Sequence, residues 1–293
     1  MGVFHSGYVA IIGRPNVGKS TLLNNILGEK VSIVTSKPQT TRRRITGIKT
    51  LKDCQIIFID TPGIHRPLHK LGEFMVYEAI EALKDVDLVL FVVEPKEFGG
   101  GDRFILDLIK KSEKRCILII NKVDLIKKAE LLPLIESFSR VHSFNAIIPL
   151  SALNKEDVAI VTMEIAKRLP EGPRYYPEDT ITDQYERFIA SEIIREKIME
   201  RTEEEVPHSV AVEMVKWKED NGKIFISANI LVEREGQKGI IIGKGGMRLK
   251  EIGKDARLEI EKLTGKKVYL ELWVKVRGKW RNDERFLKEL YGV

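Results

Sequence analysis

An octapeptide near the start of the chain, Gly-Arg-Pro-Asn-Val-Gly-Lys-Ser at residues 13–20, constrains the fold more than any other stretch. An apolar run at 8–12 precedes it, and residues 21–28 after it have helical spacing and end in a glycine. In this context of strand, glycine-rich loop and helix, the pattern predicts a phosphate site built from backbone N–H groups and a helix N-terminus. Lys19 would reach the outer phosphates, and the Ser20 hydroxyl would ligate Mg²⁺.

Length and charge set broad limits on the protein. A chain of 293 residues is long enough for two domains, and its net charge of +6 favours a polyanionic partner, nucleic acid or anionic lipid. Cys54 and Cys116 lie in separate apolar runs, which predicts buried thiols in a reducing compartment. The sequence has no cationic-then-apolar leader and no run of ~18 apolar residues, so we expect a cytoplasmic protein.

A polar, basic stretch follows the first predicted helix. Residues 35–44 read Thr-Ser-Lys-Pro-Gln-Thr-Thr-Arg-Arg-Arg, and the proline and charges predict a long mobile loop. A hydroxyl-bearing loop of this kind can become ordered when a γ-phosphate and Mg²⁺ offer it a ligand. We take Thr41 as the candidate second Mg²⁺ hydroxyl, with Thr40 as the alternative.

The next signal is Asp60-Thr61-Pro62-Gly63, which directly follows the apolar run 55–59. A carboxylate at the carboxyl end of a buried strand faces the ligand in an open α/β sheet, so Asp60 is a candidate for holding Mg²⁺, directly or through water. Gly63 has no side chain and can bring its N–H close to a γ-phosphate.

A third apolar run, 116–120, ends in Asn121-Lys122-Val123-Asp124. A carboxylate at Asp124 can accept two hydrogen bonds from the N1–H and N2–H₂ of guanine, a donor pair that adenine lacks, so these residues predict guanine selectivity. Asn121 would brace the loop, and the stem of Lys122 would cover the base. The small residues in Ser151-Ala152-Leu153 would let backbone N–H groups approach the guanine O6.

Strands and helices alternate over residues 8–169, which predicts a mostly parallel sheet with helices on both faces. The strands at 45–50 and 55–60 are the exception, because a link as short as 51–54 makes them antiparallel. We predict a helix over 73–85 with an apolar face of Phe74, Tyr77, Ala79, Ile80 and Leu83. Prolines and a glycine after residue 169 predict a semi-rigid linker at 171–182, between domains at 1–170 and 183–293.

The second predicted domain is smaller and of the α+β class. Its predicted order is a helix at 183–201, strands at 209–218 and 223–232 joined through Asn221-Gly222, two helices, a strand at 267–276 and a final helix. The two central helices meet at Gly243-Lys244-Gly245-Gly246. Backbone without side chains permits close approach of a sugar–phosphate chain, as in KH-type clamps that grip about four nucleotides. The basic residues Lys275 and Arg277 add phosphate attraction, and Trp273 and Trp280 either stack on bases or pack against the sheet.

Taken together, the motifs GRPNVGKS, QTTRR, DTPG, NKVD, SAL and GKGG, in this order, resemble those of the Era family, bacterial GTPases of small-subunit ribosome assembly. The resemblance covers essentially the whole chain. It implies an α/β P-loop GTPase domain followed by a type II KH domain. It also implies a monomeric switch that hydrolyses GTP with Mg²⁺, binds the 3′ region of 16S rRNA and assists 30S assembly. It further implies peripheral contact with the inner face of the cell membrane, which nothing in this sequence shows.

Carried over position by position, the resemblance implies four sets of site residues. Lys19, Thr41 and Gly63 are the phosphate and switch positions, and Ser20, Thr41 and Asp60 the Mg²⁺ ligands. The nucleotide-binding set is Gly13, Arg14, Pro15, Asn16, Val17, Gly18, Lys19, Ser20, Thr21, Asp60, Thr61, Pro62, Gly63, Asn121, Lys122, Asp124, Ser151, Ala152 and Leu153. The RNA-binding set is Ile241, Gly243, Lys244, Gly245, Gly246, Arg248, Lys275 and Arg277.

The chain departs from Ras-like GTPases at one position, because Ile64 follows Gly63 where those enzymes have a water-orienting glutamine. We therefore expect slow intrinsic hydrolysis, with Asn16 holding a K⁺ ion in place of an arginine finger. Two other functions are less consistent with the sequence. A P-loop kinase or ATPase is disfavoured by Asn121-Lys122-Val123-Asp124, and a passive RNA-binding module is disfavoured by the complete set of phosphate and Mg²⁺ ligands.

Overall fold

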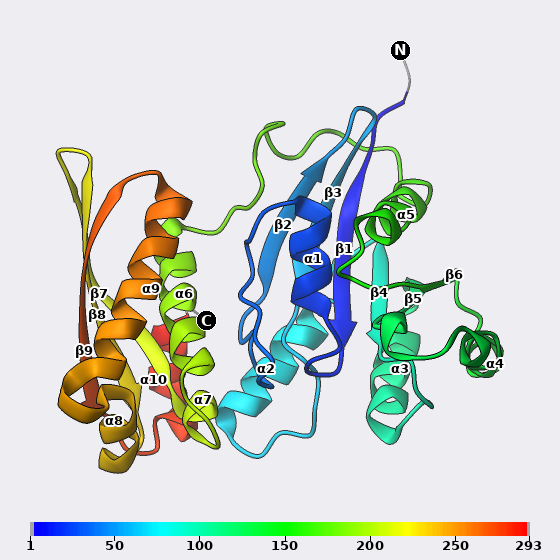
Figure 1. Ribbon diagram of the computed structural model, residues 1–293. Coiled ribbons are helices and arrows are strands. Elements are labelled where there is room, and N and C mark those ends of the chain that lie inside the picture. The colour runs from blue at the N-terminus through cyan, green and yellow to red at the C-terminus, as the bar shows by residue number, and fades with distance from the viewer. Residues whose placement is uncertain (1–2, 292–293) are drawn as a thin grey trace. The chain divides into compact units, whose positions relative to one another are not determined.

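The computed structural model describes residues 3–291 (Figure 1). The chain divides into two compact units. Unit 1 consists of the chain up to Ser32, Thr41–Leu68 and Gly72–Asp183. Unit 2 consists of Ile33–Thr40, His69–Leu71 and the chain from Gln184 onward. Two short segments of the N-terminal half therefore group with unit 2, which the order of residues along the chain does not reveal.

Unit 1 is built on a six-stranded sheet with the strand order β2-β3-β1-β4-β5-β6 (Figure 1). Neighbouring strands are parallel except β2 and β3, which confirms the antiparallel pair predicted from their short link. The strands are β1 (His5–Gly13), β2 (Ile45–Thr50), β3 (Cys54–Asp60), β4 (Leu88–Val93), β5 (Arg115–Ile120) and β6 (Ala146–Pro149).

Helices cover both faces of this sheet. Helices α1 and α5 pack together on one face, while α2, α3 and α4 contribute side chains to a buried cluster on the other (Figure 1). The helices are α1 (Lys19–Leu27), α2 (Lys70–Glu81), α3 (Gly100–Ser112), α4 (Lys128–Ser139) and α5 (Lys155–Ala166), with a short 3₁₀ turn η1 (Val123–Leu125). The predicted α/β class with a mostly parallel sheet is confirmed.

The buried face of α2 differs from the predicted one. Tyr77 is 53% exposed, whereas Leu71 and Met75 are fully buried together with Ala79. Residues 71, 75 and 79 are spaced one helical turn apart, so the helix is rotated relative to the prediction. The prediction for Tyr77 was wrong because an aromatic ring counts as apolar in the pattern although its hydroxyl favours contact with water.

The segment after α5 is bound along unit 1. The carboxamide oxygen of Gln55 accepts hydrogen bonds from the N–H groups of Tyr175 (2.9 Å) and Tyr176 (3.0 Å). The hydroxyl of Thr182 donates to the Thr46 carbonyl at 2.6 Å, and Ile48 N–H donates to the Ile181 carbonyl at 2.7 Å. Unit 1 therefore binds the proline-rich stretch predicted as a linker, mainly through backbone groups of that stretch.

Unit 2 contains a three-stranded sheet with the order β7-β8-β9 and helices packed on one face. Strands β7 and β8 are antiparallel, and β8 and β9 are parallel. Asn221 (φ 49°) and Gly222 (φ 70°) are both left-handed at the predicted hairpin turn. The elements are α6 (Glu186–Glu200), α7 (Val206–Ser209), β7 (Ala211–Asp220), β8 (Lys223–Val232), α8 (Glu235–Ile242), η2 (Lys244–Gly246), α9 (Met247–Thr264), β9 (Lys267–Val276), η3 (Trp280–Asn282) and α10 (Glu284–Tyr291).

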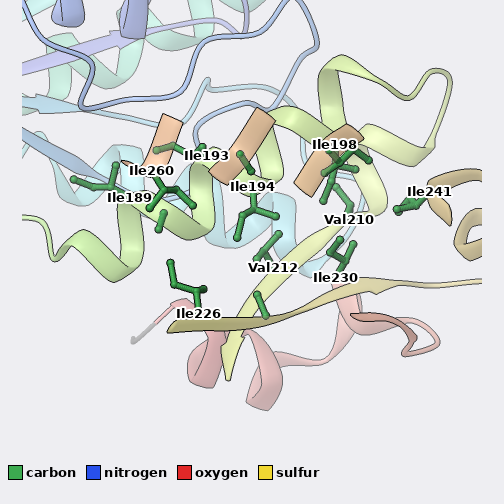
Figure 2. Packing of buried hydrophobic residues seen from close by; sticks show 14 of the residues in the cluster. Ile189, Ile193, Ile194, Ile198, Val210, Val212, Ile226, Ile230, Ile241 and Ile260 are labelled. Carbon is green, nitrogen blue, oxygen red and sulfur yellow. The ribbon is translucent and has the colours of Figure 1, made fainter. Parts of the chain in front are cut away.

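Isoleucine and valine side chains form the core of unit 2 (Figure 2). Ile193, Ile194 and Ile198 of α6 lie over Ile226 and Ile230 of β8 (Figure 2). β-Branched side chains suit this core because they pack well on a pleated sheet, and their alternation along β8 places every second residue inside.

Helix α6 also buries polar side chains, and residues 33–40 supply their partners within unit 2. The backbone N–H of Val34 donates to the Glu196 carboxylate at 2.9 Å. The Arg195 guanidinium donates to the Thr40 carbonyl and pairs with Glu192. These bonds explain why an arginine and a glutamate that are each 1% exposed can be accommodated on α6.

Candidate nucleotide site and nucleic-acid interface

The predicted phosphate loop connects β1 to α1 in unit 1. Its last residue, Gly18, is the N-cap of α1 with φ 99°, and no side chain caps the helix. The first-turn N–H groups of α1 are therefore left for an anion. The Lys19 ammonium donates to the carbonyls of Gly13 (3.2 Å) and Arg14 (2.9 Å). Burial lowers the pKa of Lys19 to about 8, although the nearby Asp60 acts to raise it, so a phosphate would stabilise the charged form.

Hydroxyl groups from separate segments converge on the Asp60 carboxylate at the end of β3. Its Oδ2 accepts hydrogen bonds from Ser20 (2.7 Å), Ser32 (2.9 Å) and Thr41 (3.5 Å). Its Oδ1 is buried and has no hydrogen-bond partner among the described residues. Burial raises the pKa of Asp60, although Lys19 and the hydroxyl donors act in the opposite direction. A buried anionic oxygen beside hydroxyl oxygens is a donor set that fits Mg²⁺.

The turn after Asp60 has little room for side chains. A Cβ atom on Gly63 would meet the backbone of Pro15 at 2.6 Å, so only glycine lets this turn approach the phosphate loop so closely. The hydroxyl of Thr61 donates to the Ile11 carbonyl at 2.7 Å and anchors the turn to β1. Ile64 is 1% exposed and belongs to the apolar cluster, so this position supplies no polar group to a water molecule.

Asn121 links the loops of the site. Its Nδ2 donates to the Val17 carbonyl at 2.7 Å, and its Oδ1 accepts from the N–H of Ala152 at 2.8 Å. Gly18 makes this contact possible, because a Cβ there would lie 2.1 Å from Nδ2 of Asn121. The bracing role predicted for Asn121 is thus visible as hydrogen bonds that tie the phosphate loop to the Ser151–Leu153 loop.

The candidate residues for the base lie in η1 and in the Ser151–Leu153 loop. Asp124 in η1 is exposed, and Leu153 is 76% exposed, so both are available to a ligand. The Lys122 ammonium donates to the Asn16 carbonyl at 2.6 Å and to Glu94 at 2.7 Å, which stretches its stem beside the phosphate loop. Partial burial acts to raise the pKa of Glu94, but hydrogen bonds from Lys122 and Lys96 hold it below its ordinary value.

Sequence reasoning missed two residues of this site, Ser32 and Glu94. Ser32 is fully buried against Asp60, and Asn24 of α1 holds its backbone: Asn24 Oδ1 accepts from Ser32 N–H at 3.1 Å, and Nδ2 donates to the Ser32 carbonyl at 2.7 Å. Neither residue belongs to a recognisable motif. Their roles depend on which segments meet in space, so spacing along the chain gave no signal.

In unit 2, the loop between α8 and α9 exposes its backbone. Gly243 (φ 72°), Gly245 (φ 59°) and Gly246 (φ 79°) all have left-handed backbone angles. A Cβ on Gly245 or Gly246 would meet no atom within 4 Å, so a ligand can approach the backbone there. Gly246 is the N-cap of α9, and no side chain caps this helix. Uncapped N–H groups beside Lys244 suit a phosphate.

A groove of about 660 Å³ begins at this loop and runs between α9 and β9. We call it the α9 groove. Its cationic wall comes from Lys250, Lys254 and Arg257, spaced so that they share one face of α9. The complete lining is Gly246, Leu249, Lys250, Glu251, Gly253, Lys254, Arg257, Leu270 and Leu272. Lys250, Lys254 and Arg257 follow the glycine loop at intervals of four and three residues, and this helical spacing could have identified the cationic wall from the sequence.

The remaining residues predicted for RNA binding lie in different surroundings. Ile241 is fully buried in the core of unit 2 and supports the loop from beneath, so its side chain does not reach the surface (Figure 2). Arg248 donates to the Ile240 carbonyl at the end of α8. Arg277 pairs with Asp283 at 2.9 Å and lies over the Phe286 ring. Lys275 is exposed on β9.

Over residues 3–291, no helix combines the length and apolar character needed to cross a lipid bilayer.

The comparisons with known proteins agree with the division into a nucleotide unit and an RNA unit. Residues 8–122 match the family model described as 50S ribosome-binding GTPase, and residues 205–281 match the KH domain model.

One curated relative decides the family. GTPase Era of Alkaliphilus oremlandii (strain OhILAs) is 53% identical over 290 residues, which cover 98% of each chain. The chain belongs to the Era family of GTPases. Two solved Era structures are each 45% identical, cover 99% of both chains and give a TM-score of 0.95. One holds MgGDPNP and nucleotides 1506–1542 of 16S ribosomal RNA, and the other is an Aquifex aeolicus Era variant bound to GDP·AlF₄⁻.

Membership of the Era family confirms the predicted class of P-loop GTPase followed by a KH domain, and it identifies the enzyme activity as GTP hydrolysis. The kinase or ATPase hypothesis is therefore wrong, and so is the hypothesis of a passive RNA-binding module.

Proposed function

We propose that this GTPase binds the 3′ region of 16S rRNA through its KH domain and assists assembly of the 30S subunit, with the bound guanine nucleotide setting when it does so. The observation that carries this function is the combination of an exposed Gly-Lys-Gly-Gly backbone with the cationic α9 groove. The Era structure with an rRNA fragment supports the choice of RNA.

In unit 1, Asp124 would accept the guanine N1–H and N2–H₂ groups, and the N–H groups of the phosphate loop would surround the β-phosphate. Mg²⁺ would be held by Ser20, Thr41 and Asp60, whose oxygens already meet. When bound, the ion neutralises the negative charge that develops as the γ-phosphate is transferred to water. Lys19 would exchange its carbonyl partners for phosphate oxygens.

Asn16 would hold a K⁺ ion that replaces an arginine finger. Asn16 has a left-handed φ of 63°, and Lys122 fixes its carbonyl, so the residue is rigidly placed at the tip of the phosphate loop. The buried Ile64 leaves hydrolysis without the usual water-orienting side chain. We expect faster GTP turnover in K⁺ than in Na⁺ for the wild type and no such difference for Asn16→Ala. Equal rates for both proteins in both salts would contradict the assignment.

In unit 2, the N-terminus of α9 and Lys244 would receive RNA phosphates, and the strand would continue between Lys254 and β9. Leu270 and Leu272 give the groove an apolar floor for bases. A KH domain reads single-stranded RNA because only unpaired bases can enter such a groove. The proposal also includes a monomeric protein that is cytoplasmic with peripheral contact at the inner membrane face. These features rest on the family resemblance alone.

The test is binding of an RNA that corresponds to nucleotides 1506–1542 of 16S rRNA. We expect Gly245→Asp to weaken RNA binding by roughly tenfold or more, because the new carboxylate would face the phosphates. Aspartate tolerates a left-handed backbone, so the fold should survive. Gly28→Asp is a matched control, since Gly28 in unit 1 also has a positive φ and open space around it.

Guanine nucleotide affinity of Gly245→Asp should equal that of the wild type. Loss of both RNA and nucleotide binding would indicate misfolding, and a second substitution, Lys244→Glu, would then repeat the test without a change at a glycine. Undiminished RNA binding by both variants would contradict the proposal.

A further inference from the structure

Part of one face of the sheet in unit 2 is open to solvent, whereas Ala211, Asn229 and Leu231 at one end of the same face are buried. Residues of β8 and β9 alternate between the helix-covered core and this face. The outward positions carry Phe225 (39% exposed), Tyr269 (62%) and Trp273 (56%), which we call the open sheet face. Phe225 and Tyr269 are cross-strand neighbours whose ring centroids lie 6.0 Å apart. Exposed apolar side chains that form one contiguous patch mark an interaction site more often than scattered ones do.

The structure also separates the two tryptophans of the C-terminal region. Trp280 is fully buried, its indole N–H donates to the Ser209 carbonyl at 3.0 Å, and its ring packs edge-on against Phe286. Its role is structural. Trp273 lies on the open sheet face with more than half of its surface exposed, so it is available for stacking.

The charges around these rings are predominantly positive. By strand register, the outward positions also hold Lys216, Lys218, Lys223, Lys267 and Lys275. The acidic groups on the same face are Glu213, which accepts from Asn229 at 2.7 Å, Asp220, which lies 3.5 Å from Lys218, and Glu271. Flat rings within a cationic border match a single-stranded nucleic acid, whose bases stack while its phosphates contact lysines.

The open sheet face adjoins the α9 groove across a single strand. Strand β9 lies at the edge of the sheet, with Leu270 and Leu272 lining the groove and Tyr269 and Trp273 on the other side. An RNA strand that leaves the groove over this edge therefore meets the rings. Continuity with the α9 groove favours RNA over anionic lipid as the occupant, and Glu271, between the two rings along β9, can accept hydrogen bonds from base amino groups.

We propose that the open sheet face is a second single-stranded RNA site, continuous with the α9 groove, where successive bases stack on Trp273 and Tyr269. This inference rests on the proposed RNA-binding function. It extends the RNA contact of the protein beyond the roughly four nucleotides that a glycine loop grips.

The test compares RNA affinity across lengths, with the full-length protein and fluorescently labelled RNA. The probes are the RNA corresponding to nucleotides 1506–1542 of 16S rRNA and a nested set shortened from each end. We expect Trp273→Ala and Tyr269→Ala each to weaken binding of the longest RNA by about tenfold. The variants should bind the shorter RNAs with the same affinity as the wild type, provided that the wild type still binds them. Trp273→Phe should retain most of the wild-type affinity for the longest RNA.

The matched control is Tyr77→Ala, since Tyr77 is a 53% exposed aromatic residue on α2 of unit 1 and belongs to neither the open sheet face nor the α9 groove. It should bind every RNA as the wild type does. The inference would be overturned if Trp273→Ala lost the same factor of affinity for long and short RNAs. It would also be overturned if the Trp273 and Tyr269 variants bound RNAs of every length with wild-type affinity. If the wild type binds none of these RNAs, the proposed function itself fails.

A direct readout is the emission of Trp273 in a Trp217→Phe background, in which Trp280 remains buried. Stacked bases should quench this emission when the longest RNA is added but not when the shortest is added. The second probe is a vesicle of phosphatidylserine and phosphatidylcholine. A response to vesicles without a response to RNA would overturn the inference and assign the open sheet face to a membrane surface.

Discussion

At the scale of single residues, the Asp60 carboxylate is the central group of the candidate Mg²⁺ site in unit 1. It is fully buried, and burial alone would make its charge costly. The cost is reduced because Ser20, Ser32 and Thr41 all direct hydroxyl groups at one of its oxygens and leave the other available to a cation. Of these hydroxyls, Ser32 is the one for which no motif assigns a role.

We predict that Ser32→Ala weakens the Mg²⁺ dependence of nucleotide binding. Hydrogen bonds to charged groups are worth ~1.5–3 kcal/mol, so the Mg²⁺ concentration needed for half-maximal GDP affinity should rise by roughly tenfold or more. The loop itself should keep its shape, because Asn24 holds its backbone. Calorimetric titration of GDP at graded Mg²⁺ concentrations measures the effect.

GDP affinity in EDTA should be unchanged in Ser32→Ala, since the hydroxyl acts through Asp60 on the ion. Ser112→Ala is the control, because that hydroxyl donates to the Ile109 carbonyl at the end of α3 and does not contact Asp60. A wild-type Mg²⁺ dependence in Ser32→Ala would show that Asp60 is positioned without it.

At the scale of elements, α9 combines a buried and a charged face. Ile252, Ala256 and Ile260 pack into the core of unit 2, while Lys250 and Lys254 line the α9 groove. The uncapped N-terminus of the helix points its N–H groups at the same groove entrance. One helix thus contributes both the dipole and the side-chain charges that a phosphate chain requires.

We predict that Lys254→Ala lowers RNA affinity and reduces the slope of log affinity against log salt by about 0.7, the value for one phosphate contact with a single strand. Lys262→Ala is the matched control, because Lys262 is an exposed lysine in the last turn of the same helix and does not line the groove. Filter binding of the 16S rRNA fragment across salt concentrations measures both slopes. Equal slopes for the wild type and Lys254→Ala would place the RNA outside the groove.

At the scale of the whole molecule, the chain passes between the two units five times. Residues 33–40 belong to unit 2, where Arg195 and Glu196 of α6 bind their backbone, and they are flanked by Ser32 and Thr41, both of which bind Asp60 in unit 1. We therefore expect a change at the Mg²⁺ site to affect residues 33–40 through the backbone. This connection is a physical route by which a nucleotide could influence RNA binding.

We predict that RNA affinity differs between the GDP-bound protein and the protein bound to a non-hydrolysable GTP analogue, by a factor within the ~5–150 typical of allosteric coupling. The double variant Glu192→Leu/Arg195→Met, which removes a buried ion pair without leaving a single charge, should reduce this ratio towards one. Anisotropy of labelled RNA in each nucleotide state measures the ratio. The control is Glu136→Leu/Arg140→Met, an exposed ion pair on α4.

RNA affinity that is the same with no nucleotide, with GDP and with the GTP analogue would contradict the coupling in the wild type. If the ratio differs from one in the wild type and is unchanged in the double variant, the coupling follows another route than residues 33–40.

The sequence alone determined the local features of this protein. The Gly-x4-Gly-Lys-Ser loop, Asp60-Thr61-Pro62-Gly63, the guanine motif ending at Asp124 and the Asn221-Gly222 hairpin each depend on neighbours along the chain. Backbone conformation and strand alternation are local, so motif spacing predicted the α/β sheet and the KH-like order of elements.

Only the tertiary structure decided which distant residues share a site. It brought Ser32 to Asp60, rotated α2 so that Tyr77 is exposed, buried Ile241 and Trp280, and left Trp273 in solvent. These outcomes depend on which faces of distant elements meet, and the meeting of such faces is governed by packing that the pattern of any one segment does not contain.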